Sequence, residues 1–167
     1  QAVKGSSLKR IVYLGGLGDP NKKLSEHLRS RHEVGKILTK AEIPVVEFRS
    51  AIIVGSASAS FELMRYGVEG LPILFCPPWV TTRVQPISIR DVLDYFIASL
   101  KLPAKQSEAH QIIEIGGAEV LTYHAMMYGY AQSRGLRRWM IILPWLPIRL
   151  CANWLQWITP IPAGMAY

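Results

Sequence analysis

His32 and Lys36 lie four residues apart in a segment that the sequence predicts to be helical, so their side chains share one face. A histidine imidazole can shuttle protons near neutral pH, because its ordinary pKa is about 6.5. Val34, Ile37 and Leu38 follow the spacing of an apolar stripe on roughly the opposite side, which we expect to pack against the core. On spacing alone, the face that carries His32 and Lys36 is therefore expected to be solvated.

Three glycines, Gly15, Gly16 and Gly18, follow a short apolar run at residues 11–14. The run predicts a strand buried on both faces. Glycines at the carboxyl end of a parallel strand let a ligand approach the backbone closely, and an ordinary tight turn is the alternative. They do not form a G-x-G-x-x-G phosphate loop, because that motif needs a helix directly behind it and residues 19–21 intervene.

Strands and helices alternate along the chain. Strands are expected near residues 11–14, 43–48, 52–54, 73–76, 85–89, 111–115 and 140–143, and helices near 25–41, 61–68, from Asp91 onward and after Thr122. Ser25, Asp91 and Thr122 are expected to cap their helices, because side chains of these types accept hydrogen bonds from the first helical turn. This alternation predicts an α/β fold with a mainly parallel sheet. Doubly buried strands need neighbours on both sides, so we expect chain that precedes Gln1, or a partner, to cover an open sheet edge.

The composition excludes several classes of protein. The net charge is +7, but lysines and arginines are scattered and no recognition helix or RNA-binding motif accompanies them, so we expect no nucleic-acid partner. Cys76 and Cys151 are far apart, and the histidines lack metal-site spacing, so neither a disulfide framework nor a metal site is expected. A reducing, cytoplasmic location fits this cysteine usage best.

Residues 136–167 differ in composition from residues 1–135, because they form a tail rich in tryptophan and proline. Residues 148–158 predict an amphipathic helix, and prolines and polar residues argue against a membrane span. Tryptophans of this tail could lie at a bilayer interface. We favour packing against a further domain or partner, and expect no contact with a membrane surface.

Five segments together resemble the short-chain dehydrogenase/reductase family, in its extended and atypical branches. These are residues 9–16 (KRIVYLGG), 28–36 (LRSRHEVGK), 44–55 (PVVEFRSAIIVG), 85–92 (QPISIRDV) and 113–117 (IEIGG) with 121–123 (LTY). The closest resemblance is to the NmrA-like, NAD(P)H-binding epimerase/dehydratase-like group, and it covers roughly residues 8–135. It implies the second half of a Rossmann-type, doubly wound parallel sheet, with a small substrate-side α/β portion.

The resemblance also implies a site for NAD or NADP. The family's Y-x-x-x-K pattern aligns with residues 32–36, so Lys36 would hold the nicotinamide ribose and His32 would stand in place of the catalytic tyrosine as general acid. The serine or threonine that assists the tyrosine is missing near Gly15 and Gly16. The backbone residues expected to line the cofactor are Leu14, Gly15, Gly16, Ala51 and Ile52.

Two functions follow as hypotheses. The first is an NAD(P)-binding oxidoreductase-like protein acting on a small-molecule substrate. The second is a non-catalytic, NAD(P)H-responsive regulatory or scaffold protein. The loss of the family's catalytic tyrosine and serine favours this second hypothesis. Because the pyrophosphate of a dinucleotide binds at the first strand-to-helix turn of this fold, we expect full cofactor binding only together with an N-terminal half that precedes Gln1.

Overall fold

The computed structural model describes residues 7–40, 43–56, 58–101 and 110–146. The chain divides into two compact units. The first unit comprises Gln1–Ala51 and Ile87–Gly117, and the second comprises Ile52–Pro86 and Ala118–Tyr167. The expected division at residue 135 stays a prediction, because residues 147–167 and the helix expected within them lie outside the described residues.

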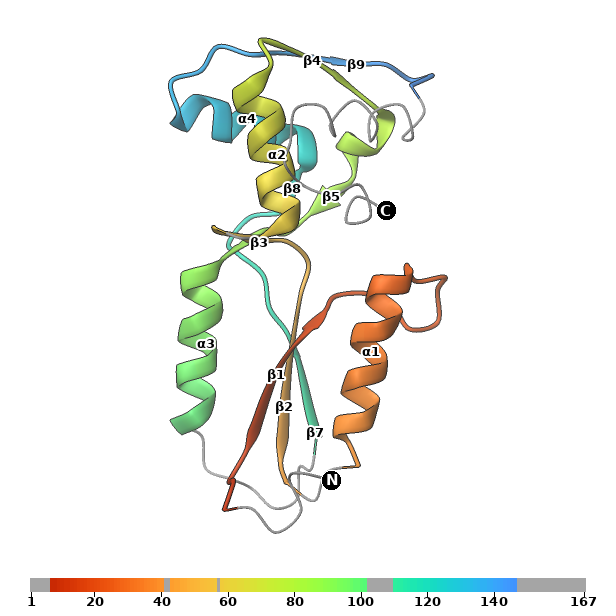
Figure 1. The fold of residues 1–167 in the computed structure, drawn as a ribbon, viewed down its shortest axis with the longest axis vertical. Coiled ribbons are helices and arrows are strands. Elements are labelled where there is room, and N and C mark those ends of the chain that lie inside the picture. The colour runs from red at the N-terminus through yellow and green to blue at the C-terminus, as the bar shows by residue number, and fades with distance from the viewer. Residues whose placement is uncertain (1–6, 41–42, 57, 102–109, 147–167) are drawn as a thin grey trace. The chain divides into compact units, whose positions relative to one another are not determined.

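A three-stranded parallel sheet forms the centre of the first unit (Figure 1). Its strands are β1 (Ile11–Gly16), β2 (Val45–Ser50) and β7 (His110–Glu114), in the order β1-β2-β7. The register pairs Gly16 with Ser50 and Arg49 with Glu114. The predicted α/β fold with a parallel sheet is therefore confirmed.

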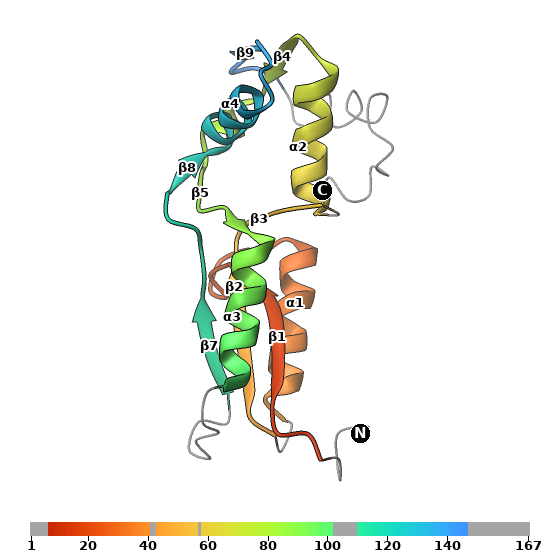
Figure 2. The same cartoon turned by 90° about the vertical axis from the view of Figure 1, so that its left-hand side faces the viewer.

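Two helices cover the opposite faces of this sheet (Figure 2). One is α1 (Glu26–Leu38) and the other is α3 (Ile89–Lys101), which follows the short strand β6 (Ile87–Ser88). Successive side chains of a strand point to opposite faces. Accordingly, Phe48 of β2 stacks on Phe96 of α3 with ring centroids 5.5 Å apart, whereas its neighbour Glu47 lies on the α1 side.

The helix starts follow capping chemistry. Ser25 caps α1 as expected, since its hydroxyl accepts a hydrogen bond from the Leu28 backbone nitrogen at 3.3 Å. The prediction that Asp91 caps α3 is wrong. Ser88 does so instead, accepting from the Asp91 nitrogen at 3.1 Å, because α3 begins at Ile89, three residues before the start that a cap at Asp91 implies.

Among its described residues, the second unit contains two small sheets and two α-helices. In chain order its elements are β3 (Ile53–Val54), α2 (Ala59–Gly70), β4 (Ile73–Cys76), the 3₁₀ helix η1 (Pro78–Thr81), β5 (Arg83–Val84), β8 (Leu121–Thr122), α4 (Tyr123–Ser133) and β9 (Trp139–Ile142). β4 and β9 pair in parallel, and β5 and β8 pair antiparallel. Thr122 caps α4 as predicted, with its hydroxyl 3.0 Å from the Ala125 nitrogen.

The core of the second unit lies between its helices and β4. Its buried members are Val68, Leu74, Cys76, Val80, Met127 and Ala131. The other side of the β4–β9 pair is apolar and open, with Trp139 72% exposed and Phe75 46% exposed. No helix among the described residues is long and apolar enough to cross a membrane.

Candidate functional site

The carboxyl ends of β1 and β2 form one edge of the sheet in the first unit. Leu14, Gly15 and Gly16 end β1, and Ala51 directly follows β2. The two ends are joined by a hydrogen bond from the Leu17 nitrogen to the Ser50 carbonyl at 2.8 Å. The structure thus brings these four predicted residues to one edge, whereas Ile52, the fifth, is a buried residue of the second unit.

His32 lies at this same edge, because α1 follows β1 and runs back along the sheet. Its side chain is buried, and its Nε2 is 3.0 Å from the Gly16 carbonyl oxygen. A carbonyl oxygen only accepts hydrogen bonds, so Nε2 of His32 carries the proton in this arrangement. The imidazole therefore attaches the middle of α1 to the last residue of β1.

The burial of His32 corrects the expected orientation of α1. The described residues that α1 buries are His32 and Gly35, while Val34 is 41% exposed and Ile37 is 60% exposed. The apolar stripe therefore does not form the core contact that periodicity indicated. The physical reason is contact with the sheet: Gly35 allows α1 to approach it closely, and the imidazole of His32 gains the Gly16 carbonyl as a partner.

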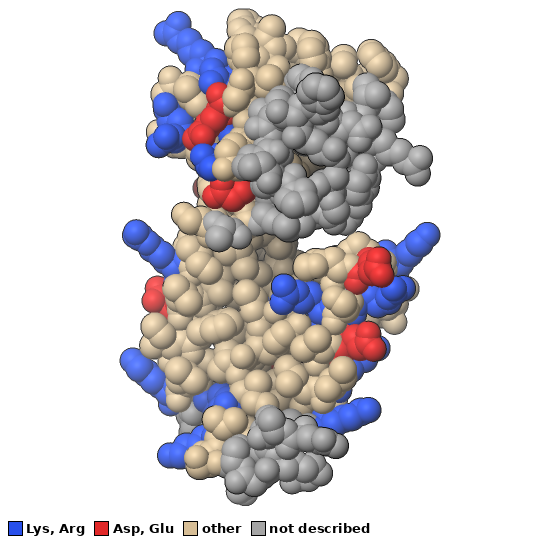
Figure 3. Space-filling model, in the orientation of Figure 1, with Lys and Arg blue, Asp and Glu red and all other residues tan. Residues whose placement is uncertain are grey.

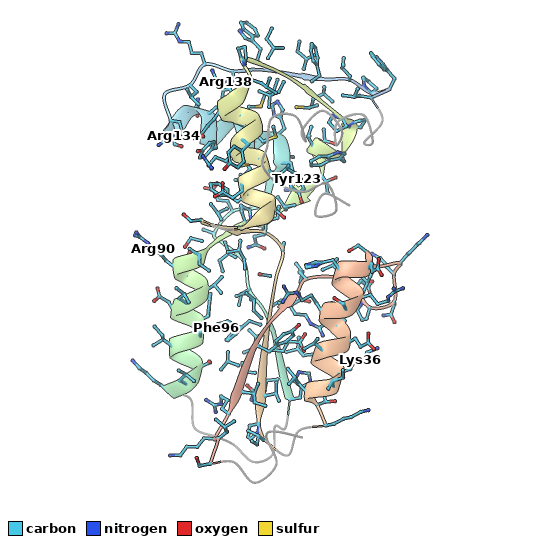
Figure 4. The ribbon with its side chains drawn as sticks, viewed as in Figure 1. Lys36, Arg90, Phe96, Tyr123, Arg134 and Arg138 are labelled. Carbon is cyan, nitrogen blue, oxygen red and sulfur yellow. The ribbon has the colours of Figure 1, made fainter. Side chains whose placement is uncertain are left out.

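Lys36 follows Gly35 and is exposed. Figure 4 labels it on α1, one helical turn beyond His32. An exposed ammonium on this helix is available to a ligand hydroxyl. The structure therefore separates the two predicted catalytic residues by environment, with His32 enclosed by protein and Lys36 accessible.

Close packing accounts for both glycines at the end of β1. A Cβ atom at Gly15 would lie 2.8 Å from Oε1 of Glu47, and one at Gly16 would lie 2.5 Å from Cδ2 of Leu28. Neither position has room for a larger residue while Glu47 and Leu28 stay in place. This packing is a reason for glycine that does not require a ligand.

A buried charged cluster lies beneath α1, and the sequence did not reveal it. Glu47 of β2 is 0% exposed, and its two oxygens each receive a partner. Arg49 Nε donates to Oε1 at 2.7 Å, and His110 Nε2 lies 3.0 Å from Oε2. Within the described ranges, no three His, Cys, Asp or Glu side chains gather as a possible metal site.

A partial signal for this cluster is present in the sequence. The run Val46-Glu47-Phe48-Arg49 alternates apolar and charged residues, which puts Glu47 and Arg49 on one face of a strand. The third member, His110, comes 63 residues after Glu47, and nothing local links the two. The register that pairs β2 with β7 brings them together.

The fold was compared with known proteins. No protein-family model matches the chain, and no curated protein matches it. Solved structures do match. MoeE5 in complex with UDP-glucose and NAD is 14% identical with a TM-score of 0.63, covering 82% of this chain and 52% of that one. RMD from Pseudomonas aeruginosa, complexed with NADPH, is 11% identical with a TM-score of 0.61, covering 81% and 54%.

A third structure covers more of the chain. UDP-glucuronic acid 4-epimerase from Bacillus cereus, in complex with UDP-glucuronic acid and NAD, is 17% identical with a TM-score of 0.60 and covers 99% of this chain and 61% of that one. At these identities the likeness is one of fold. The chain spans between half and two thirds of the length of these three proteins.

Proposed function

We propose that this chain supplies the nicotinamide side of an NAD(P) site in an oxidoreductase-like protein of the short-chain dehydrogenase/epimerase type. The observation that carries the proposal is the position of His32 and Lys36. Both lie on the helix that directly follows β1, and His32 contacts the last residue of that parallel strand. In open α/β sheets, ligands bind outside the carboxyl ends of the strands.

The choice of cofactor is supported by the fold neighbours, whose structures contain NAD or NADPH. In this proposal the exposed Lys36 ammonium donates to the nicotinamide ribose, while the backbone at Gly16 and Ala51 lines the nicotinamide end. NAD(P)H would supply a hydride to a carbonyl substrate. The residues of this chain would orient the nicotinamide and hold the proton that the reduced oxygen receives.

His32 is the residue proposed to hold that proton. In the described geometry its Nε2 proton is directed at the Gly16 carbonyl, so delivery to a substrate requires this bond to open. The same bond supports the second candidate function, a non-catalytic NAD(P)H-responsive protein in which His32 has a structural role. The two functions differ in turnover and agree in cofactor binding.

The proposal includes a partner surface for the first unit. β1 is one of the two outer strands of the described sheet, with β2 on its paired side, and α3 leaves Leu93 and Ile97 about half exposed. We propose that the remaining half of a dinucleotide-binding domain covers this edge, in this protein or in a partner chain. Exposed parallel-sheet edges and apolar stripes of this kind are otherwise prone to aggregation.

The experiment compares NADPH binding by the full-length protein and by a Lys36→Ala variant, using nicotinamide fluorescence. Loss of one hydrogen bond from a charged donor costs about 1.5–3 kcal/mol, so we expect Kd to rise roughly 10- to 100-fold. Lys40→Ala is the matched control, since Lys40 is also exposed and lies just beyond the same helix. Equal affinities in the wild type and the Lys36→Ala variant would remove Lys36 from the site.

Turnover separates the two candidate functions. NADPH oxidation is followed with a panel of carbonyl compounds and quinones in the wild type and in a His32→Ala variant. A general acid contributes typically 10²- to 10⁴-fold, so the catalytic hypothesis predicts a loss of about that size with cofactor affinity kept. Binding without turnover in the wild type supports the non-catalytic alternative, and unchanged turnover in His32→Ala excludes His32 as the acid.

A further inference from the structure

The Glu47 carboxylate fills the space between β1 and α1. A Cβ atom placed on Gly15 from below would approach Oε1 to 2.8 Å, and one placed on Gly35 from above would approach Oε2 to 2.5 Å. Glu47 is therefore in van der Waals contact with the backbone of both elements, and it is fully buried between them. Gly15 in β1 and Gly35 in α1 both leave room for the same carboxylate, because a Cβ atom at either position would come too close to it.

The carboxylate is also held in a fixed orientation. Arg49 Nε binds one oxygen at 2.7 Å and His110 Nε2 lies 3.0 Å from the other. Arg49 is on the same strand and His110 is on the neighbouring strand β7, so both anchors belong to the sheet. A buried charge that accepts hydrogen bonds at both oxygens does not rotate freely, because each alternative rotamer leaves a charged group unpaired.

The contact on Gly35 lies between the two residues of the proposed site. Gly35 comes three residues after His32, on the same buried side of α1, and Lys36 follows Gly35 directly. Any change in the distance between α1 and the sheet at Gly35 moves both side chains. It also changes the 3.0 Å contact between His32 Nε2 and the Gly16 carbonyl oxygen.

We propose that Glu47 is the positioning residue of this site, and that its carboxylate sets the height of α1 above β1 and thereby the positions of His32 and Lys36. The roles of His32 and Lys36 in this inference rest on the proposed function. The positioning role of Glu47 itself rests on the packing of its side chain between Gly15 of β1 and Gly35 of α1. The test is designed so that the two can fail separately.

The first measurement is a double-mutant cycle for stability between Gly35 and Glu47. Gly35→Ala alone should strongly reduce the folding equilibrium constant, because the added methyl has no room beside Oε2. In a Glu47→Ala background the same change should be neutral or stabilising, since alanine is the better helix former. We expect a coupling of at least about tenfold in the equilibrium constant, which is within the range for residues in contact.

Two controls separate volume from general destabilisation. Gly129→Ala in α4 adds a methyl to a helical glycine with nothing within 4 Å, so it should not destabilise. Glu47→Gln keeps the volume of the side chain, so Gly35→Ala should remain as harmful in that background as in the wild type. If Glu47→Ala does not fold, Glu47→Asp replaces it, because it retracts the carboxylate by one methylene and keeps the charge.

The second measurement reports the position of His32 in the full-length protein. The ¹⁵N–¹H signal of His32 Nε2 should be lost or shifted in Gly35→Ala and in Glu47→Ala, and restored in the double variant, where the added methyl takes the place of the lost carboxylate. Val46→Ala is the matched control, because Val46 is buried on the same strand but on the opposite face. It should lower stability and leave the His32 signal in place.

Each outcome has one meaning. Additive stability effects would refute the positioning role of Glu47. So would a His32 signal that responds to Val46→Ala as much as to Gly35→Ala. Neither result bears on whether the protein binds NADPH. If the positioning role of Glu47 is confirmed, KM for NADPH should rise in Gly35→Ala and recover in the Gly35→Ala/Glu47→Ala double variant. Absence of NADPH binding in the wild type would refute the proposed function, while the cycle and the His32 signal would still establish what Glu47 does.

Discussion

At the scale of single residues, the environment of a side chain decides its chemistry more than its type does. His32 was expected on a solvated face, yet it is buried and bonded to the Gly16 carbonyl. Lys36, four residues later, is exposed. Lys36 is therefore accessible to a ligand, whereas the described hydrogen bond of His32 is to the backbone.

The first residue-scale prediction concerns the stability contribution of that bond. His32→Phe keeps an aromatic ring but removes the Nε2 donor, so the Gly16 carbonyl oxygen loses this hydrogen bond. An unsatisfied buried polar group costs about 1–3 kcal/mol, so we expect a loss of free energy of unfolding in that range by chemical denaturation. His27→Phe, at an exposed position of the same helix, should change it by less than about 0.5 kcal/mol. If His32→Phe lowers the free energy of unfolding no more than His27→Phe does, the hydrogen bond between His32 and Gly16 does not stabilise the protein.

At the scale of elements, most strands and helices could be predicted from the sequence. The side of α1 that packs against the sheet could not. The strand at residues 73–76 matches β4 in both bounds, and the predicted caps Ser25 and Thr122 are observed. These features depend on local chemistry that is written in a few neighbouring residues. The orientation of α1 depends instead on Glu47, which lies on a different element, and on His110, which lies far away in sequence.

The second unit shows the same dependence on distant partners. Glu69 of α2 accepts hydrogen bonds from Tyr130 of α4 at 2.5 Å and from Arg65 at 2.8 Å. Acidic and basic side chains lie together over these two helices in Figure 3. Arg138 adds a link to the end of α2, donating to the Val68 carbonyl at 2.6 Å and to the Glu69 carbonyl at 3.1 Å.

A pH prediction follows at this scale. The hydrogen bond from Tyr130, with the charges of Arg65 and Arg134, holds the pKa of Glu69 below its usual value. A lowered pKa in the folded state stabilises the protein above the ordinary carboxyl range, and this contribution is lost as pH falls through the lowered pKa. Glu69→Gln should therefore be less stable than the wild type at neutral pH, and the difference should shrink on acidification.

The measurement for Glu69 is thermal unfolding of both proteins between neutral and acidic pH. Glu119→Gln serves as the control, because Glu119 is exposed and its replacement should change stability little at any pH. A difference between Glu69→Gln and the wild type that stays constant or grows on acidification would contradict the assigned cause.

At the scale of the whole molecule, the α/β class and the parallel sheet followed from the alternation of apolar runs and helical patterns, and the parallel pairing of β1, β2 and β7 confirms that expectation. The chain spans about half of MoeE5 and of RMD from Pseudomonas aeruginosa. The substrate could not be predicted, since it depends on side chains that no local pattern brings together. The cofactor is proposed from the sheet edge, where β1 and β2 end, and from Lys36, an exposed lysine on the helix that follows β1.

In the proposed function, Lys36 and the carboxyl ends of β1 and β2 hold the nicotinamide half of NAD(P)H. The most direct test is a crystal structure of the full-length protein with NADPH bound. We expect the nicotinamide to lie beside Gly16 and Ala51, with the ribose hydroxyls about 3 Å from Lys36 Nζ. Cofactor bound at another place, with Lys36 in bulk water, would contradict it.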